Sequence, residues 1–348
     1  MMNRLLCASL TAAVLLLGSP AQAEVRQDRI ELADEHPTEY VVVKGDTLWD
    51  ISGHFLKSPW LWPDVWYVNP QIDNPHLIYP GDIIYLTWVD GQPRLGLKRG
   101  VKKLGPKVRV LPLDQAIPSI PLKDIAAFLN NNRVVDEDLL EKAPYVIGGK
   151  NERIVAGAGD RIYARGIPVE DVSFQGVYRP ARAYHDPVTN ELLGYELDRV
   201  ADGRIMAMDE ATQVLTMDLS DSFEKEVRVR DRVIPSDEQR INSVFYPSPG
   251  EAIDKAVIME VLGGIEKIGQ FDVVALNVGE REGVETGNVF AVFNRGEVVK
   301  DPVTGETITL PSERAGELMV FKVFNKVSYG LVMRATNVIS VGDKLKSP

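Results

Sequence analysis

The sequence predicts an α+β protein: a small strand–helix–helix–strand module near its start, followed by mostly-β repeated units. Three observations predict this. All five tryptophans lie in one window, between Trp49 and Trp88. Helix-like and strand-like patterns alternate across that window. Beyond residue 143, short runs of Val, Ile, Tyr and Phe alternate with Gly, Asp and Asn, which is typical of β structure.

The first residues have the pattern of an export signal. Arg4 precedes the apolar run "LLCASLTAAVLLLG", and "AQA" at 21–23 offers a small-residue cleavage site. We therefore expect a signal peptide over 1–23, cleaved after Ala23, and an exported, periplasmic protein. No other stretch is apolar and long enough to predict a transmembrane segment after cleavage. Cys7, the only cysteine, lies inside the signal, so the mature chain is expected to have no disulfide and no thiol chemistry.

The net charge of −11 argues against nucleic acid or anionic lipid as a main partner, because both require a basic face. Composition shifts divide the remaining chain into segments. These are a polar tether (24–39), the tryptophan-rich module (40–88), a linker with short helices (91–142), β unit 1 (143–235), a connector (236–254) and β unit 2 (255–348).

The two β units share an internal repeat. "DPVTNE" (186–191) matches "DPVTGE" (301–306), and "VRDRV" (229–233) matches "VGDKL" (341–345). We also align "YVIGGKNERIVAGAGDRIYA" (145–164) with "VVALNVGEREGVETGNVFAV" (273–292). The hexapeptide predicts a hairpin turn, because Asn190 and Gly305 tolerate the left-handed conformation that closes one.

Within the module, local signals place the elements in order. A strand is expected over 40–43 and a closing strand over 83–86. Between them, Thr47 is expected to cap a helix, with Asp50 as its capping-box partner. A second short helix is expected to carry Pro63 in its first turn. The order is strand, helix, helix, strand.

Three motifs in this window resemble the LysM family: "GDTL" (45–48), "NP" (69–70) and "IYPGD" (78–82). The resemblance implies binding of N-acetylglucosamine chains, as in peptidoglycan and chitin, in a groove between two loops. Carried onto matching positions, the glycan-binding residues are Gly45, Asp46, Thr47, Leu48, Asn74, Pro75, His76, Leu77, Ile78 and Tyr79.

The window departs from the LysM pattern by an insertion, "LKSPWLWP" (56–63), which carries Trp60 and Trp62. Three interpretations stay open. The indoles stack on sugar, they contact another protein, or they build the core of a small module that needs large side chains.

No catalytic site is expected. The mature chain lacks cysteine, its histidines (His36, His54, His76 and His185) show no metal-ligand spacing, and G-x-S-x-G does not occur. We therefore expect no bound metal and no cofactor. A cell-wall hydrolase, or another envelope-assembly factor targeted to peptidoglycan by the module, is the alternative that remains.

The whole arrangement resembles the type IV pilus secretin-associated proteins of Gram-negative bacteria. In that family the C-terminal region is similar to the C-terminal domain of a flagellar basal-body ring protein. The resemblance implies a non-enzymatic scaffold that anchors or aligns an outer-membrane secretin ring on peptidoglycan.

Overall fold

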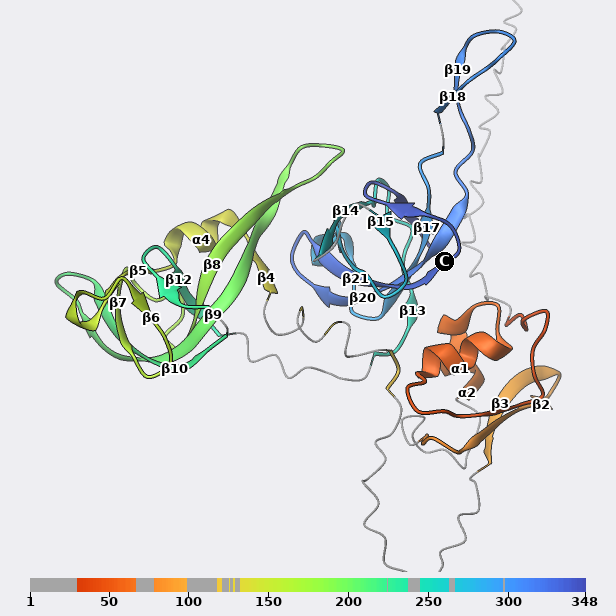
Figure 1. The fold of residues 1–348 in the computed structure, drawn as a ribbon, viewed down its shortest axis with the longest axis horizontal. Helices are drawn as coiled ribbons and strands as arrows, with labels where there is room; N and C mark the ends of the chain where they lie inside the picture. Colours follow the sequence, from red (N-terminus) through yellow and green to blue (C-terminus); the bar gives the residue numbers. More distant parts are fainter. Residues whose placement is uncertain are drawn as a thin grey trace, which may run out of the picture.

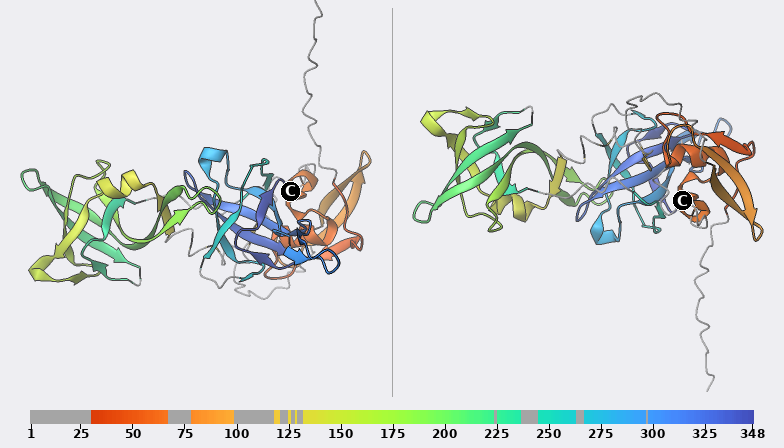
Figure 2. Two further views of the ribbon diagram at one scale, coloured as in Figure 1. Left: turned by 90° about the horizontal axis from the view of Figure 1, so that it is seen from above. Right: turned by 90° about the horizontal axis from the view of Figure 1, so that it is seen from below.

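The computed structural model forms three parts in a row (Figure 1). Barrel 2 (248–348) lies between barrel 1 (132–236) and the N-terminal module (30–98), and the views from above and below show the same order (Figure 2). The structure describes residues 30–66, 78–98, 118–120, 125, 128, 132–223, 225–236, 245–262, 267–296 and 298–348. The predicted signal peptide lies outside these residues. Among them, no helix has both the length and the apolar character needed to cross a membrane.

The N-terminal module has the predicted strand–helix–helix–strand order. Its elements are β1 (Glu39–Val41), α1 (Leu48–Phe55), the 3-10 helix η1 (Pro59–Leu61), α2 (Trp62–Trp66), β2 (Ile83–Val89) and β3 (Gln92–Lys98). The three strands form an antiparallel sheet in the order β1-β2-β3. Figure 1 shows both helices on one side of this sheet.

Strand β3 corrects the sequence prediction, which placed 91–142 in a linker. Asp90 (φ 50°) and Gly91 (φ 77°) form a tight turn that returns the chain along β2. Asp-Gly is a strong hairpin signal because both residues tolerate positive φ. The Lys- and Pro-rich composition after residue 91 concealed it.

The predicted tether, 24–39, is also part of the module where the structure describes it. Leu32 forms a β-bridge with Leu56, and the Ala33 N–H donates to the Phe55 carbonyl at 2.9 Å. The Lys57 N–H donates to the Glu31 carbonyl at 2.9 Å. Residues 31–33 therefore hold the C-terminal end of α1.

Barrel 1 is a closed ring of six antiparallel strands in the order β10-β7-β5-β12-β8-β9, with β9 returning to β10. The strands are β5 (Tyr145–Gly149), β7 (Arg161–Arg165), β8 (Phe174–His185), β9 (Leu192–Asp209), β10 (Val214–Ser222) and β12 (Arg232–Pro235). Around the ring lie β4 (Asn132–Val135), α4 (Glu137–Lys142), η2 (Lys150–Glu152) and the pair β6 (Val155–Ala156) and β11 (Val227–Arg228). Since β4 pairs with β9, barrel 1 begins within the segment predicted as linker.

Barrel 2 follows the same plan. Its six strands are β14 (Ile258–Leu262), β16 (Val273–Leu276), β17 (Asn288–Phe293), β20 (Arg314–Val323), β21 (Ser328–Ala335) and β23 (Lys344–Lys346). Their order is β23-β17-β20-β21-β16-β14, and the Val257–Lys344 bridge closes the ring. Accessory elements are β13 (Ser248–Pro249), η3 (Glu280–Glu282) and the pairs β15 (Lys267–Ile268) with β22 (Ile339–Ser340) and β18 (Val298–Lys300) with β19 (Thr307–Thr309).

Taken in chain order, the six strands of each barrel are arranged first-second-fifth-fourth-third-sixth. Equivalent hydrogen bonds close both rings: Val146 N–H donates to the Asp231 carbonyl at 2.8 Å, and Ile258 N–H to the Asp343 carbonyl at 3.0 Å. The predicted "VRDRV" and "VGDKL" match falls on this closing turn, where Arg230 (φ 80°) and Gly342 (φ 86°) are both left-handed.

The sequence alignment of 145–164 with 273–292 is wrong by one strand. It places β5 on β16, whereas the strand order makes β14 the equivalent of β5. The equivalent turns are Gly157–Asp160 and Gly269–Asp272, in each of which the aspartate accepts the glycine N–H. Turns of this Gly/Asp type recur along both units, so a shift by one hairpin still aligns glycines with glycines.

A hairpin joins the barrels. We call the tip of β8–β9, residues 182–193, arm 1. Its Glu191 carboxylate lies 2.8 Å from Arg281 Nη1 and 2.8 Å from Lys326 Nζ, both of barrel 2. Asn277 Nδ2 donates to Asp186 Oδ1 at 3.2 Å. Because Tyr184 and Leu193 are buried beside these polar contacts, arm 1 docks on barrel 2 through an apolar and ionic joint.

The joint is expected to weaken only in strong acid. Arg281 and then Lys326 hold the pKa of Glu191 at about 2, well below its ordinary value. A carboxyl group whose pKa is lowered by docking stabilises the docked form at pH values above the pKa of the undocked group, about 4.3. That contribution is lost as pH falls through about 2. Amide protection factors of residues 186–193, corrected for the intrinsic exchange rate at each pH, should therefore stay high from pH 8 to 5 and fall below pH 4. In Glu191→Gln this acid step should be smaller, because only Asp186, whose pKa is also lowered, then remains to titrate in the joint. A step of unchanged size would contradict the assignment.

Candidate glycan-binding site

The first loop of the predicted groove is built by a short turn after β1. Gly45 adopts φ +105°, which favours glycine. The Asp46 carboxylate accepts the Val43 N–H at 2.8 Å and the Tyr40 hydroxyl at 3.0 Å. Burial, then the hydrogen bond to Asp46, raises the pKa of Tyr40. Asp46 is therefore committed to shaping the loop.

Thr47 caps α1 as the sequence predicts. Its Oγ1 accepts the Asp50 N–H at 3.1 Å, and the Asp50 carboxylate accepts the Thr47 N–H at 3.1 Å. This reciprocal pair is a capping box. Thr47 and Leu48 are only 2% and 0% exposed, so they shape the groove from beneath.

The chain itself occupies the free donors at the start of α1. The Leu48 N–H donates to the Pro118 carbonyl at 3.0 Å, and the Trp49 N–H to the Ser119 carbonyl at 3.3 Å. A helix leaves its first N–H groups without intrahelical partners. The sequence prediction offered residues 45–48 as open to glycan, but the Leu48 donor is taken in this structure by a segment that we call the strap, residues 118–120.

The strap is fixed on its other side as well. Ser119 and Ile120 are 1% and 0% exposed. Ser119 Oγ accepts the N–H of Phe245, a buried residue of the connector between the barrels. Sequence reasoning missed the strap because residues 118–120 contact α1 across a long separation in the chain and carry no local motif.

The second loop of the predicted groove is described in part. Asn74, Pro75, His76 and Leu77 lie outside the described residues. Ile78 is fully buried and Tyr79 is half-buried, with the Tyr79 N–H donating to Asp82 Oδ2 at 3.0 Å. The Gly81 N–H donates to the Val42 carbonyl at 2.8 Å, so the second loop meets the chain just after β1. The structure thus brings Tyr79 to the same end of β1 as Gly45.

Trp60 and Trp62 are core residues in this structure. They are 5% and 1% exposed, which leaves no open indole face for sugar stacking or for contact with another protein. The insertion forms η1 and the start of α2 instead of an open loop. The Trp62 ring lies 6.1 Å from the ring of Tyr246, centroid to centroid. The insertion therefore binds the chain's own connector, and Trp88, at 60% exposure, is the accessible indole among the described residues.

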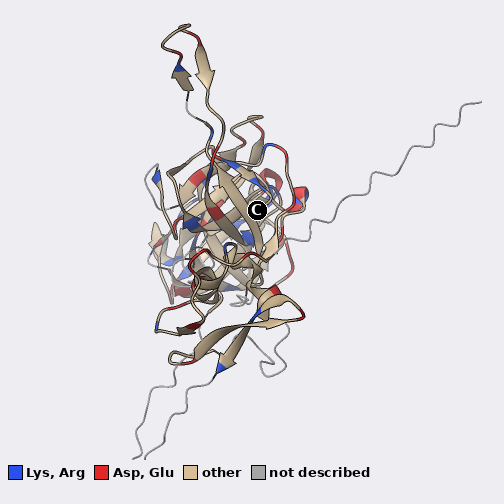
Figure 3. Cartoon of the chain, turned by 90° about the vertical axis from the view of Figure 1, so that its right-hand side faces the viewer, with Lys and Arg blue, Asp and Glu red and all other residues tan. Residues whose placement is uncertain are grey.

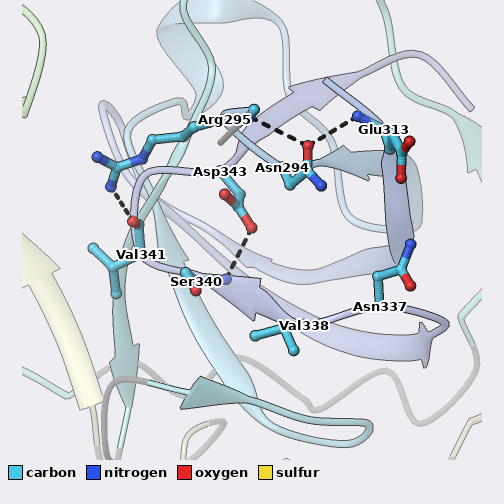
Figure 4. Close-up of a pocket in the computed structure, with 9 residues that line it drawn as sticks. Asn294, Arg295, Glu313, Asn337, Val338, Ser340, Val341 and Asp343 are labelled. Atoms are coloured by element: carbon cyan, nitrogen blue, oxygen red, sulfur yellow. Dashed lines mark hydrogen bonds between the residues drawn. The ribbon is translucent and has the colours of Figure 1, made fainter. Parts of the chain in front are cut away.

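The described residues also line two hollows away from the predicted groove. One, of about 530 Å³, is in barrel 2, where Asn294 Oδ1 accepts the Glu313 N–H and Asp343 accepts the Ser340 N–H (Figure 4). These polar groups hold loops of the barrel together. The other, of about 710 Å³, lies between α1 and barrel 2, lined in part by Trp49, Lys57 and Arg334.

Comparison with known proteins agrees with the motifs. No curated protein matches the chain. One family model matches, and it covers the segment that contains both groove loops, α1, α2 and most of β2. A match to this family supports binding of peptidoglycan. Residues 40–87 are a LysM domain.

Proposed function

We propose that this protein is a non-enzymatic, periplasmic scaffold that anchors or aligns an outer-membrane secretin of a type IV pilus system on peptidoglycan. The single observation that carries the proposal is the LysM domain at 40–87. The described part of its second loop meets the first loop at one end of β1, through the hydrogen bond from Gly81 to Val42, and we assign the binding of an N-acetylated sugar chain to this place. We assign binding of the secretin to the two barrels.

The buried acids of barrel 1 support a structural role for this unit. Asp231 lies 2.8 Å from Arg179, and Glu196 lies 2.7 Å from Arg182. An arginine beside a buried carboxylate pairs with it and fixes its orientation. Such carboxylates hold neighbouring strands together, and we assign them no catalytic role. A zymogram on purified peptidoglycan should therefore show no cleared zone. A cleared zone would favour the cell-wall hydrolase.

The secretin partner rests on the order of the parts, namely a predicted export signal, a LysM domain and two β-barrels. We expect in-cell photo-cross-linking from exposed barrel positions, such as Ile154 and Val338, to recover a secretin. Recovery of only a flagellar or unrelated envelope protein would place the function elsewhere.

The strap regulates the same groove in this proposal. Glycan that uses the Leu48 N–H must first displace the Pro118 carbonyl, which lies 3.0 Å away. A binding-competent state that is only partly populated lowers the apparent affinity by that fraction. The strap is connected through Ser119 to Phe245 and hence to barrel 2, so a partner that moves the connector would expose the donor.

Tyr79 offers a binding test that spares the core, whereas substitutions at buried Thr47 or Ile78 would test folding. We expect Tyr79→Ala to lower retention on purified peptidoglycan about tenfold, the effect of losing one aromatic anchor of about 1.4 kcal/mol. The matched control is Trp88→Ala, an exposed aromatic of the same domain outside the groove. Equal retention of both variants would remove Tyr79 from the site.

A further inference from the structure

Barrel 2 carries a second arm built like arm 1. We call β18–β19 and the residue after them, 298–310, arm 2. In both tips the residue at the fifth position of the hexapeptide is left-handed, Asn190 at φ 62° and Gly305 at φ 74°. Each donates its N–H to the first aspartate's carbonyl, at 2.8 Å to Asp186 and 2.9 Å to Asp301. The predicted hairpin turns are confirmed, and both tips share one geometry.

The two arms differ in what they touch. Arm 1 docks on barrel 2, but arm 2 stands clear of the rest of the protein (Figures 1 and 3). Residues 302–310 are all exposed. Position 193 of arm 1 is a leucine, 2% exposed in the joint, whereas the corresponding Ile308 of arm 2 is 43% exposed. Arm 2 therefore presents apolar side chains where its counterpart buries them.

Barrel 1 exposes the surface on which such an arm would dock. Arm 1 sits on the chain that follows β16, through Asn277 and Arg281. The strand equivalent to β16 is β7, and the chain that follows β7 exposes Ile167 (58%), Val169 (40%) and Val172 (43%). A cluster of exposed branched apolar residues in a loop is expected where a binding surface lacks its partner.

One pair of charges at this surface also matches, whereas Val169 stands at the position of Arg281, so the Glu191–Arg281 ion pair is not repeated. Arg165, exposed at the end of β7, occupies the position that Asn277 holds after β16, and Asp301 occupies the position of Asp186. The Asn277–Asp186 hydrogen bond of the existing joint thus becomes an Arg165–Asp301 pair of opposite charges in the equivalent contact.

We propose that arm 2 of one copy docks on residues 165–172 of a second copy, repeating between molecules the contact that arm 1 makes with barrel 2. The contact uses different surfaces on the two copies, so it is head-to-tail. Such an interface closes into a ring or continues as a filament. This inference is independent of glycan binding.

The test uses the chain without residues 1–23 and two variants, Ile308→Asp in arm 2 and Val169→Asp in the acceptor. In sedimentation velocity the unmodified chain should form species larger than a dimer as concentration rises, while each variant alone stays monomeric. An equimolar mixture of the variants should form a dimer and nothing larger, because it retains one intact arm and one intact acceptor. Val338→Asp, an exposed position outside both surfaces, should associate like the unmodified chain.

A monomer at every concentration of the unmodified chain would overturn the proposal, as would a variant mixture that stays monomeric. Dimers of either variant alone would show a symmetric contact and overturn it too. If either Asp variant melts early, Ile308→Ser and Val169→Ser replace it. As a second measurement, the double variant Val303→Cys/Val169→Cys should give a disulfide-linked ladder on mild oxidation. The single cysteine variants should not extend beyond dimers, and absence of the ladder would count against the contact.

Discussion

Trp62→Ala should destabilise the LysM domain by about 3–5 kcal/mol, the usual cost of truncating a buried tryptophan. The side chain is 1% exposed, and its ring lies 6.1 Å from that of Tyr246. The substitution therefore removes core packing and the contact between the domain and the connector together. The matched control, Trp88→Ala, removes the same side chain at a position 60% exposed and should change stability by under about 1 kcal/mol.

Tryptophan fluorescence measures this effect without interference from the barrels, because all five indoles lie between Trp49 and Trp88. In a denaturant titration, the fluorescence midpoint of Trp62→Ala should fall well below that of Trp88→Ala. The far-UV transition of barrel 1 should keep its own midpoint, since the apolar interior of barrel 1 is separate from the core of the domain. Equal midpoints for the two variants would show that Trp62 is not part of the domain core.

Ile120→Ala should raise the affinity for N-acetylglucosamine oligomers. Ile120 is fully buried, and truncating such a side chain costs about 2–5 kcal/mol. The lost packing destabilises the strap, whose Pro118 and Ser119 carbonyls accept hydrogen bonds from the first N–H groups of α1. Because affinity scales with the fraction of molecules whose groove is open, a weaker strap should increase it about tenfold or more.

Titration calorimetry with chitin oligomers measures this change. Ile120→Val is the matched control, since it removes one methyl group and should cost about 0.5–1.5 kcal/mol. The variants should rank Ile120→Ala, Ile120→Val and unmodified chain in falling affinity. An unchanged or lower affinity in Ile120→Ala, with tryptophan fluorescence showing a folded domain, would mean that the strap belongs to the bound state.

Local signals allowed much of the LysM domain and the tips of both arms to be predicted. The Thr47–Asp50 capping box and the left-handed residues of the two hexapeptides depend on neighbours within a few positions, and the structure contains all of them. The Asp90–Gly91 hairpin carries an equally local signal. It was missed because composition alone assigned the following residues to a linker.

Features that depend on distant contacts could not be predicted in the same way. The strap contacts α1 although it lies far from α1 in the sequence. Trp62 contacts Tyr246 across an even longer separation. Burial of Trp60 and Trp62 follows from those contacts, so their surroundings could not be inferred from the insertion itself. The closure of each barrel likewise depends on pairing the first and last strands of its unit, as between Val146 and Asp231.

The central claim is that the LysM domain binds peptidoglycan through N-acetylated sugars. The most direct test is a calorimetric titration of the chain without residues 1–23 with an N-acetylglucosamine oligomer and, separately, with a glucose oligomer of the same length and linkage. The proposal predicts saturable binding of the acetylated oligomer alone, weakened in Tyr79→Ala. Equal binding of both oligomers, or binding of neither even when Ile120→Ala loosens the strap, would contradict it.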